Sequence, residues 1–141
     1  MSAEKVCIMG LGYIGLPTAC LFAKSGFNVL GVDINPHVVK TLLSGKSHLV
    51  NEPDMDEILA ETIASGKFKV ASEPSEADFF IICVPTPFQS DYAADLTYVE
   101  AAVTSILPYV RKGASVALES TSPPGTTQQV LVKTLEAKGF K

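Results

Sequence analysis

The sequence has no tryptophan, only two histidines and only three cysteines, and these shortages exclude several kinds of site. No Cys-x-x-Cys pair and no His/Cys cluster occurs, and His37 and His48 stand alone, so we expect no metal. The chain has an odd number of cysteines, and each lies in an apolar stretch: Cys7, Cys20 and Cys83. That pattern is typical of reduced, packed thiols, and it predicts a cytoplasmic protein without a disulfide framework.

Basic residues are scarce as well. The chain has 11 Lys and Arg against 15 Asp and Glu, a formal charge of −4 and no basic stripe, so we expect no nucleic-acid partner. The uncharged run 6–23 is nominally long enough to span a bilayer, but Gly10, Gly12, Gly15 and Pro17 interrupt it. It also lacks the positive start and the cleavage site of a signal peptide. We therefore expect no membrane segment and no secretion signal.

Short apolar runs alternate with amphipathic helical patterns along the whole chain. The expected strands are Lys5–Met9, Asn28–Val32, Phe68–Ala71, Phe79–Val84 and Ser115–Leu118. The expected helices run over 16–24, from Pro36 to before Gly45, from Asp54 to before Gly66, from Asp95 to before Gly113, and from Thr126 or Thr127 to before Gly139. Continuously apolar strands joined by helices predict an α/β fold with a doubly wound parallel sheet of the Rossmann type.

Helix ends carry recognisable capping residues. Asn35 precedes a proline at the first helical position, and Asp95 precedes the fourth helix. Asp54 is followed three residues later by Glu57, which predicts a capping box. The five expected strands are one fewer than a complete two-halved Rossmann domain contains. We therefore expect residues 1–141 to form a fragment of such a domain without its last strand, and the unpaired sheet edge to promote association.

The segment GLGYIG at residues 10–15 matches the dinucleotide-binding fingerprint G-x-G-x-x-G. It directly follows an expected strand and opens an expected helix, which is the context that the fingerprint requires. Gly10 would allow the tight turn, Gly12 would let a pyrophosphate approach the backbone, and Gly15 would let the helix pack against the strand. The N–H groups of Tyr13 and Ile14 at the start of the helix would then bind the anion.

An acid completes this fingerprint. Asp33 ends the second expected strand, where its carboxylate would accept hydrogen bonds from ribose hydroxyls and repel a 2′-phosphate. Neither Ile34 nor Asn35 supplies the cation that NADP would require. The alternative is that Asp33 is only a turn or cap residue. Together, the strand, the glycines and the acid predict NAD as the cofactor.

Four motifs in order, GLGYIGLP, GVDIN, VPTPF and ESTSPPGTT, resemble those of the nucleotide-sugar 6-dehydrogenases, the family of UDP-glucose and GDP-mannose dehydrogenases. The resemblance covers that family's N-terminal NAD domain only. It implies oxidation of a UDP-sugar C6 alcohol to the uronate with two NAD⁺, with UDP-N-acetylmannosamine as the expected substrate. It also implies a homodimer for the full-length protein and no catalysis by this fragment, because the nucleophilic cysteine and the lysine would lie beyond Lys141.

Hydroxyl residues follow the last two expected strands. Thr86 lies between two prolines, and its hydroxyl and backbone would face the ribose region of the cofactor. The alternative, on loop chemistry alone, is that it belongs only to a stiff surface turn. By the resemblance, Thr86 and Thr127 contact NAD, and Thr121 helps to hold a catalytic water. The alternative for residues 120–127 is that they only cap the last helix.

Two other functions remain open from the sequence. One is the NAD domain of a different β-hydroxyacid-type dehydrogenase, which we would expect to lack the paired motifs VPTPF and ESTSPPGTT. The other is a non-catalytic NAD-sensing module.

Overall fold

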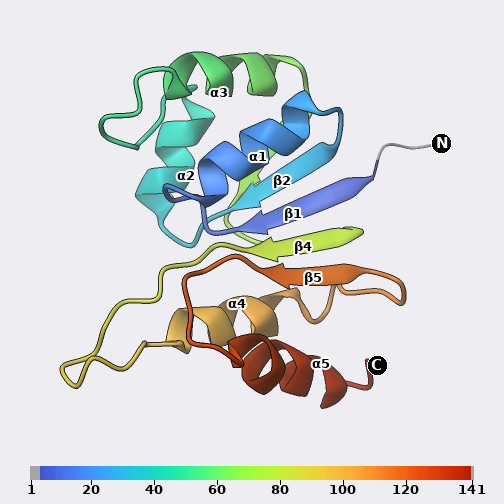
Figure 1. Ribbon diagram of the computed structural model, residues 1–141. Coiled ribbons are helices and arrows are strands. Elements are labelled where there is room, and N and C mark those ends of the chain that lie inside the picture. Colours follow the sequence, from blue (N-terminus) through green and yellow to red (C-terminus); the bar gives the residue numbers. More distant parts are fainter. Residues whose placement is uncertain (1–3, 141) are drawn as a thin grey trace.

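The computed structural model describes residues 4–140, and a parallel sheet runs through its centre. The sheet has five strands in the order β3-β2-β1-β4-β5 (Figure 1). The strands are β1 (Lys5–Met9), β2 (Asn28–Val32), β3 (Phe68–Ala71), β4 (Phe79–Ile82) and β5 (Ser115–Leu118). Strand order reverses between β1 and β4, so the expected doubly wound Rossmann-type fold is confirmed.

The central strands are apolar throughout because both faces of the sheet are covered. In β1, Val6 and Ile8 belong to the core on one face, whereas Cys7 and Met9 belong to the core on the other. All four side chains are at most 5% exposed. Continuous apolar runs are typical of such doubly covered parallel strands.

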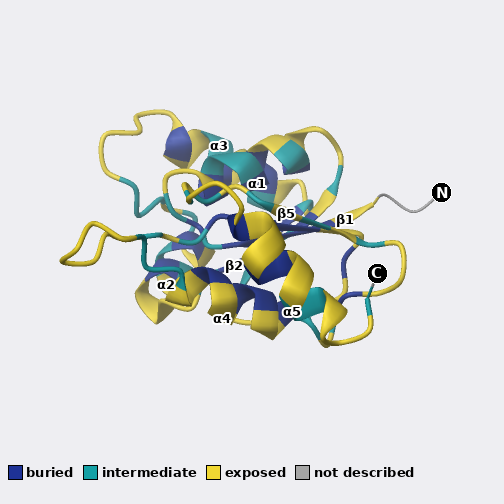
Figure 2. Cartoon of the chain, turned by 60° about the horizontal axis from the view of Figure 1, so that its bottom comes forward, coloured by how far each residue is buried: buried dark blue, intermediate teal, exposed yellow. Residues whose placement is uncertain are grey.

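Three helices lie on one face of the sheet and the remaining helical segments lie on the other (Figure 1). The first group is α1 (Gly15–Lys24), α2 (Pro36–Leu43) and α3 (Met55–Ala64). The second group is α4 (Thr97–Ile106), the π-helical segment η1 (Thr127–Val132) and α5 (Lys133–Glu136). Figure 2 shows buried strands between the layers and exposed outer faces on α4 and α5.

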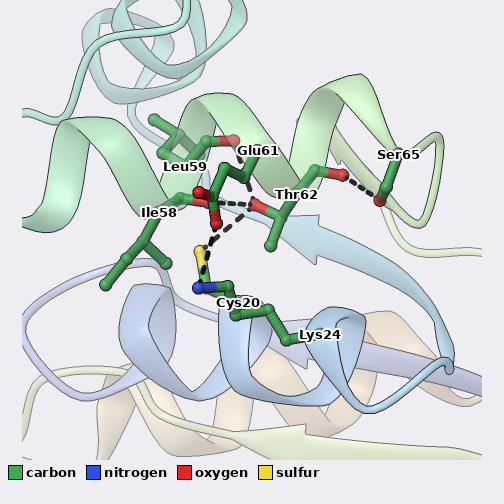
Figure 3. A network of polar contacts seen from close by, with 7 residues as sticks. All are labelled: Cys20, Lys24, Ile58, Leu59, Glu61, Thr62 and Ser65. Atoms are coloured by element: carbon green, nitrogen blue, oxygen red, sulfur yellow. Dashed lines mark hydrogen bonds and ion pairs between the residues drawn. The ribbon is translucent and has the colours of Figure 1, made fainter.

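Helices α1 and α3 are joined by polar contacts at their interface (Figure 3). Thr62 is 2% exposed, and its hydroxyl oxygen lies 2.9 Å from the Ile58 carbonyl and 3.7 Å from the Cys20 sulfur. Near the protein surface, Lys24 forms an ion pair with Glu61 at 3.0 Å. The buried hydroxyl is therefore satisfied, and burial raises the pKa of the Cys20 thiol, which stays protonated.

One of the expected capping residues is confirmed and two are wrong. The Asn35 side chain accepts the His37 N–H at 3.0 Å, as a capping residue does. Leu96, not Asp95, is the cap residue of α4, although the Asp95 side chain accepts the Thr97 N–H at 2.9 Å just before the helix. Asp54 makes no such bond, and no capping box forms. Its backbone is helical, with φ −94° and ψ −1°, instead of extended, and an extended backbone is what aims a capping side chain at the following N–H groups.

Other boundaries also differ from the sequence expectation. Strand β4 ends at Ile82, before Val84, and the last helix is divided into η1 and α5. The uncharged run 6–23 divides into β1, the glycine loop (residues 10–15) and most of α1. No helix in residues 4–140 is both long and apolar enough to cross a bilayer. Strand β5 lies at the edge of the sheet, and the absence of a sixth strand next to it stays a prediction.

Candidate functional site

The glycine loop connects β1 to α1 at the carboxyl end of the sheet, beside the end of β4. Gly10 has φ +92°, and a Cβ atom on it would lie 2.9 Å from the Cys83 carbonyl oxygen. A Cβ on Gly15 would lie 1.7 Å from the Gly10 carbonyl oxygen. Both positions therefore require glycine, which confirms the expected tight turn and the close packing of α1.

Gly12 differs from these two glycines. A Cβ built on it would meet no atom within 4 Å, and its φ lies outside the left-handed region. The space over Gly12 is open, and no side chain caps the start of α1, where Tyr13 and Ile14 lie exposed. Open space over a glycine next to an uncapped helix start is the geometry that admits a phosphate group.

Asp33 lies directly after β2 and its carboxylate faces the glycine loop. One carboxylate oxygen accepts the Leu11 N–H at 2.9 Å, and the other accepts the Asn35 N–H at 2.9 Å. These bonds hold the carboxylate beside the loop and leave lone pairs for further donors, such as two hydroxyl groups of a ribose. Asp33 is thus a turn residue at the start of α2 and also a fixed acceptor at the site.

A second loop packs on the glycine loop, which the sequence did not reveal. The Tyr13 hydroxyl group lies 3.1 Å from the Val50 carbonyl oxygen, to which it donates, and it accepts the Val50 N–H at 3.2 Å. His48, in the same segment, is half-buried near the Leu11 backbone, and its Nδ1 atom is buried without a partner in the described residues. Burial lowers the pKa of His48, although the nearby Asp33 charge opposes this.

The carboxyl ends of β4 and β5 are cross-linked by hydroxyl groups. The Thr86 hydroxyl donates to the Thr121 carbonyl, and the Ser120 hydroxyl donates to the Val84 carbonyl at 2.6 Å. The two loops that follow these strands are therefore held together beside the glycine loop. Thr86 and Thr121 are neighbours, as their places after adjacent parallel strands imply.

Cys83 and Glu119 form another contact that the sequence did not predict. The Cys83 sulfur lies 3.8 Å from a carboxylate oxygen of Glu119. Burial, followed by the Glu119 charge, raises the pKa of the Cys83 thiol to about 12, and burial raises that of Cys7 to about 11. Neither thiol is a thiolate at neutral pH, which agrees with the expectation that neither is a nucleophile.

Thr127 is exposed at the first position of η1, and no hydrogen bond joins its side chain to the other candidate residues in the described part of the chain. The buried hydroxyl here belongs to its neighbour Thr126, which is 3% exposed and donates to the Pro123 carbonyl at 2.7 Å. Neither threonine caps the helix through its side chain. The geometry thus groups Thr86 with Thr121 and leaves Thr127 apart.

A surface groove of about 330 Å³ lies between α1 and α3, lined by apolar side chains such as Pro17, Leu21 and Ile58. None of residues 10–15 lines this groove, so it is separate from the glycine loop site. In residues 4–140 no three His, Cys, Asp or Glu side chains are grouped in a way that could hold a metal ion.

The doubly wound sheet, the glycine loop and the acid after β2 together define a dinucleotide-binding domain. Residues 4–141 match the family model described as the NAD binding domain of the UDP-glucose/GDP-mannose dehydrogenase family. The chain belongs to this family, and its cofactor is NAD.

Relatives in this family include the UDP-N-acetyl-D-mannosamine dehydrogenase of Yersinia pestis, with 46% identity over 98% of this chain. The NDP-N-acetyl-D-galactosaminuronic acid dehydrogenase of Ralstonia solanacearum is 46% identical over 90% of this chain. Among solved structures, the UDP-N-acetyl-mannosamine dehydrogenase of Staphylococcus aureus superposes with a TM-score of 0.94 and 42% identity over 98% of this chain. The chain spans about a third of the length of these proteins: 33%, 30% and 34%, respectively.

Proposed function

We propose that this chain is the N-terminal NAD-binding domain of a longer nucleotide-sugar 6-dehydrogenase. The proposed enzyme oxidises the C6 alcohol of a UDP-sugar to the uronate with two NAD⁺ per turnover, and UDP-N-acetylmannosamine is the favoured substrate. The observation that carries the proposal is the pairing of the open space over Gly12 with the Asp33 carboxylate, which is hydrogen-bonded to the same glycine loop at Leu11. The family match and the mannosamine-type relatives support the reaction and the substrate.

The residues at the glycine loop suit a dinucleotide. The pyrophosphate would lie over Gly12 and accept hydrogen bonds from N–H groups at the start of α1, among them those of Tyr13 and Ile14. The adenosine ribose would donate its hydroxyls to Asp33, whose negative charge disfavours a 2′-phosphate at the same place. No Lys or Arg follows Asp33 directly, since Ile34 and Asn35 come next, so the chain favours NAD over NADP.

The other half of the cofactor would lie across the reversal in strand order, beyond the ends of β4 and β5. The Thr86 hydroxyl donates to the Thr121 carbonyl, so it is left with acceptor capacity towards a ribose hydroxyl of the cofactor. We propose that Thr86 and Thr127 contact NAD and that Thr121 helps to position a water molecule. Of these, Thr127 has the weakest support, because in the described residues no hydrogen bond joins it to the other two.

When bound, NAD⁺ supplies the hydride acceptor for oxidation of the alcohol. The covalent step of the family needs a thiolate and a basic neighbour, and the raised pKa values of Cys7 and Cys83 argue against either as that thiolate. We therefore propose that the nucleophile, the lysine and the sugar-binding residues lie in other parts of the full-length protein. The same proposal includes a homodimer and a cytoplasmic location, and the three free, buried cysteines support the latter.

The identity of the sugar rests on the relatives, which do not all act on the same compound. Two proteins that are equally similar to this chain, at 46% identity, are named for N-acetylmannosamine and for N-acetylgalactosaminuronic acid. We favour N-acetylmannosamine because the S. aureus structure named for it covers 98% of the chain.

The test is a turnover assay on the full-length protein with UDP-N-acetylmannosamine, and with UDP-N-acetylgalactosamine and UDP-glucose as competitors. We expect two NADH per molecule of UDP-N-acetylmannosamine consumed, the highest kcat/KM for that sugar, and no turnover by the 141-residue chain alone. A preference for another UDP-sugar would overturn the substrate, and one NADH per sugar would overturn the four-electron oxidation. Turnover by the isolated chain would contradict the placement of the nucleophile elsewhere.

A further inference from the structure

Glu119 directly follows β5. Its side chain lies on the face of the sheet that α1 covers, next to Cys83 at the end of β4. Its N–H donates to the Ile82 carbonyl at 2.9 Å, which extends the β4–β5 pairing by one residue and fixes its backbone. Its carboxylate lies 3.8 Å from the Cys83 sulfur, and the Cys83 side chain is in turn next to Gly15. The carboxylate is therefore held beside the glycine loop, on the β5 side of the strand-order reversal.

The Cys83 thiol is suited to hold this carboxylate. Its raised pKa, which comes from burial first and the Glu119 charge second, keeps it protonated, so the S–H can donate to the Glu119 oxygen. No cation neutralises Glu119 in the described residues, where the ion pairs are Lys24–Glu61 and Arg111–Glu76. The site therefore holds an unpaired negative charge at the end of β5.

The position of this charge relative to NAD follows from the proposed function, on which the inference rests. Asp33 would hold the adenosine ribose after β2, and the pyrophosphate would lie over Gly12, next to the reversal between β1 and β4. The nicotinamide half would then extend to the ends of β4 and β5, where Glu119 lies. The oxidised nicotinamide ring carries a formal positive charge, and addition of a hydride removes it.

We propose that Glu119 makes the site selective for the oxidation state of the cofactor, because its carboxylate attracts the cationic ring of NAD⁺ and has no matching attraction for NADH. Thr86 and Thr121 contribute hydroxyl and carbonyl dipoles at the same strand ends but no net charge. An enzyme that uses NAD⁺ twice benefits from such a bias, since it binds the incoming oxidised cofactor more tightly and releases the reduced one.

The experiment compares the dissociation constants of NADH and NAD⁺ for the wild-type chain and for Glu119→Gln, which removes the charge and keeps the shape. NADH is measured by its fluorescence, and NAD⁺ is measured by competition against NADH. We expect the ratio Kd(NADH)/Kd(NAD⁺) to fall about fivefold in Glu119→Gln at low ionic strength, as the loss of one water-screened attraction between two unit charges implies. The difference should shrink at high salt.

Two further variants keep the test decisive. Glu119→Asp retains the charge and should keep a ratio near that of the wild type, which separates charge from packing. Glu57→Gln removes an exposed carboxylate on α3 and should leave the ratio unchanged. If the wild type binds both forms and Glu119→Gln leaves the ratio unchanged, the inference is wrong and the proposed function stands. If the folded wild type binds neither form, the proposed function fails and the inference fails with it.

Discussion

One added methyl group should separate cofactor binding from folding within the glycine loop. At Gly12 the new Cβ would occupy the open space above the loop, and the backbone there is not left-handed. Gly12→Ala should therefore fold normally and bind NADH poorly. At Gly15 the new Cβ would lie 1.7 Å from the Gly10 carbonyl oxygen, so Gly15→Ala should damage the fold itself.

The two substitutions differ in expected magnitude. Gly12→Ala should change the free energy of unfolding by at most about 0.5 kcal/mol, as surface changes without a special backbone role do. If it displaces the pyrophosphate from one charge-assisted hydrogen bond, worth about 1.5–3 kcal/mol, NADH affinity should fall by roughly ten- to a hundredfold. Gly15→Ala cannot be relieved by moving a side chain, so we expect a loss of about 3 kcal/mol or more.

Thermal unfolding and NADH fluorescence titration on the same samples give both quantities. For a chain of this size, the Gly15→Ala loss corresponds to a fall in Tm of about 10 °C, against about 2 °C at most for Gly12→Ala. Unimpaired NADH binding by Gly12→Ala would refute the assignment of the space above Gly12 to the pyrophosphate. A Gly12→Ala variant as unstable as Gly15→Ala would refute the steric argument.

Two further predictions concern the surroundings of the site. Tyr13→Phe removes the hydroxyl group that pairs with both backbone groups of Val50, so amide hydrogen exchange at Val50 and its neighbours should accelerate. The free energy of unfolding should fall by only about 1 kcal/mol or less. Unchanged amide exchange would contradict the pairing of Tyr13 with Val50. The pKa values of Cys7 and Cys83 are raised from 9.0 to about 11 and about 12, so above pH 9 the unfolded state loses thiol protons that the folded state keeps. The free energy of unfolding should therefore fall as pH rises from 9 to 12. In denaturant titrations, a Cys7→Ala/Cys83→Ala double variant should show a shallower fall with pH than the wild type. An equally steep fall in both proteins would show that the two thiols do not cause the pH dependence.

The parts of the site that could be predicted from the sequence depend on local geometry. A strand, a glycine loop and a helix adjacent in sequence must also be adjacent in space, so Gly10 and Gly15 could be given steric roles from spacing alone, and the structure confirms them. Asp33 can be placed by the same reasoning, because it directly follows β2, the strand next to β1. Its bond to the Leu11 N–H follows from that adjacency.

Contacts between distant segments could not be predicted, since they depend on strand order and loop path. The pairing of Cys83 with Glu119 requires that β4 and β5 be neighbours with a particular register. The bond between Tyr13 and Val50 depends on the path of an irregular loop, for which the sequence offers no periodicity. The capping box at Asp54 failed for a related reason, because residue types indicate a cap but do not fix the backbone dihedrals that make it.

We infer that this chain binds NAD through the glycine loop and Asp33. The most direct test is a fluorescence titration with NADH and NADPH in parallel, on the wild type and Asp33→Ala, with Asp54→Ala as a matched control because Asp54 does not cap α3. Circular dichroism should first show that each variant is folded, because Asp33→Ala leaves the Leu11 and Asn35 N–H groups without their acceptor. We expect the wild type to prefer NADH, Asp33→Ala to lose both NADH affinity and this preference, and Asp54→Ala to keep both. A folded wild type that binds neither cofactor, or an Asp33→Ala variant that binds NADH as tightly and as selectively as the wild type, would show that Asp33 and the glycine loop do not form the NAD site.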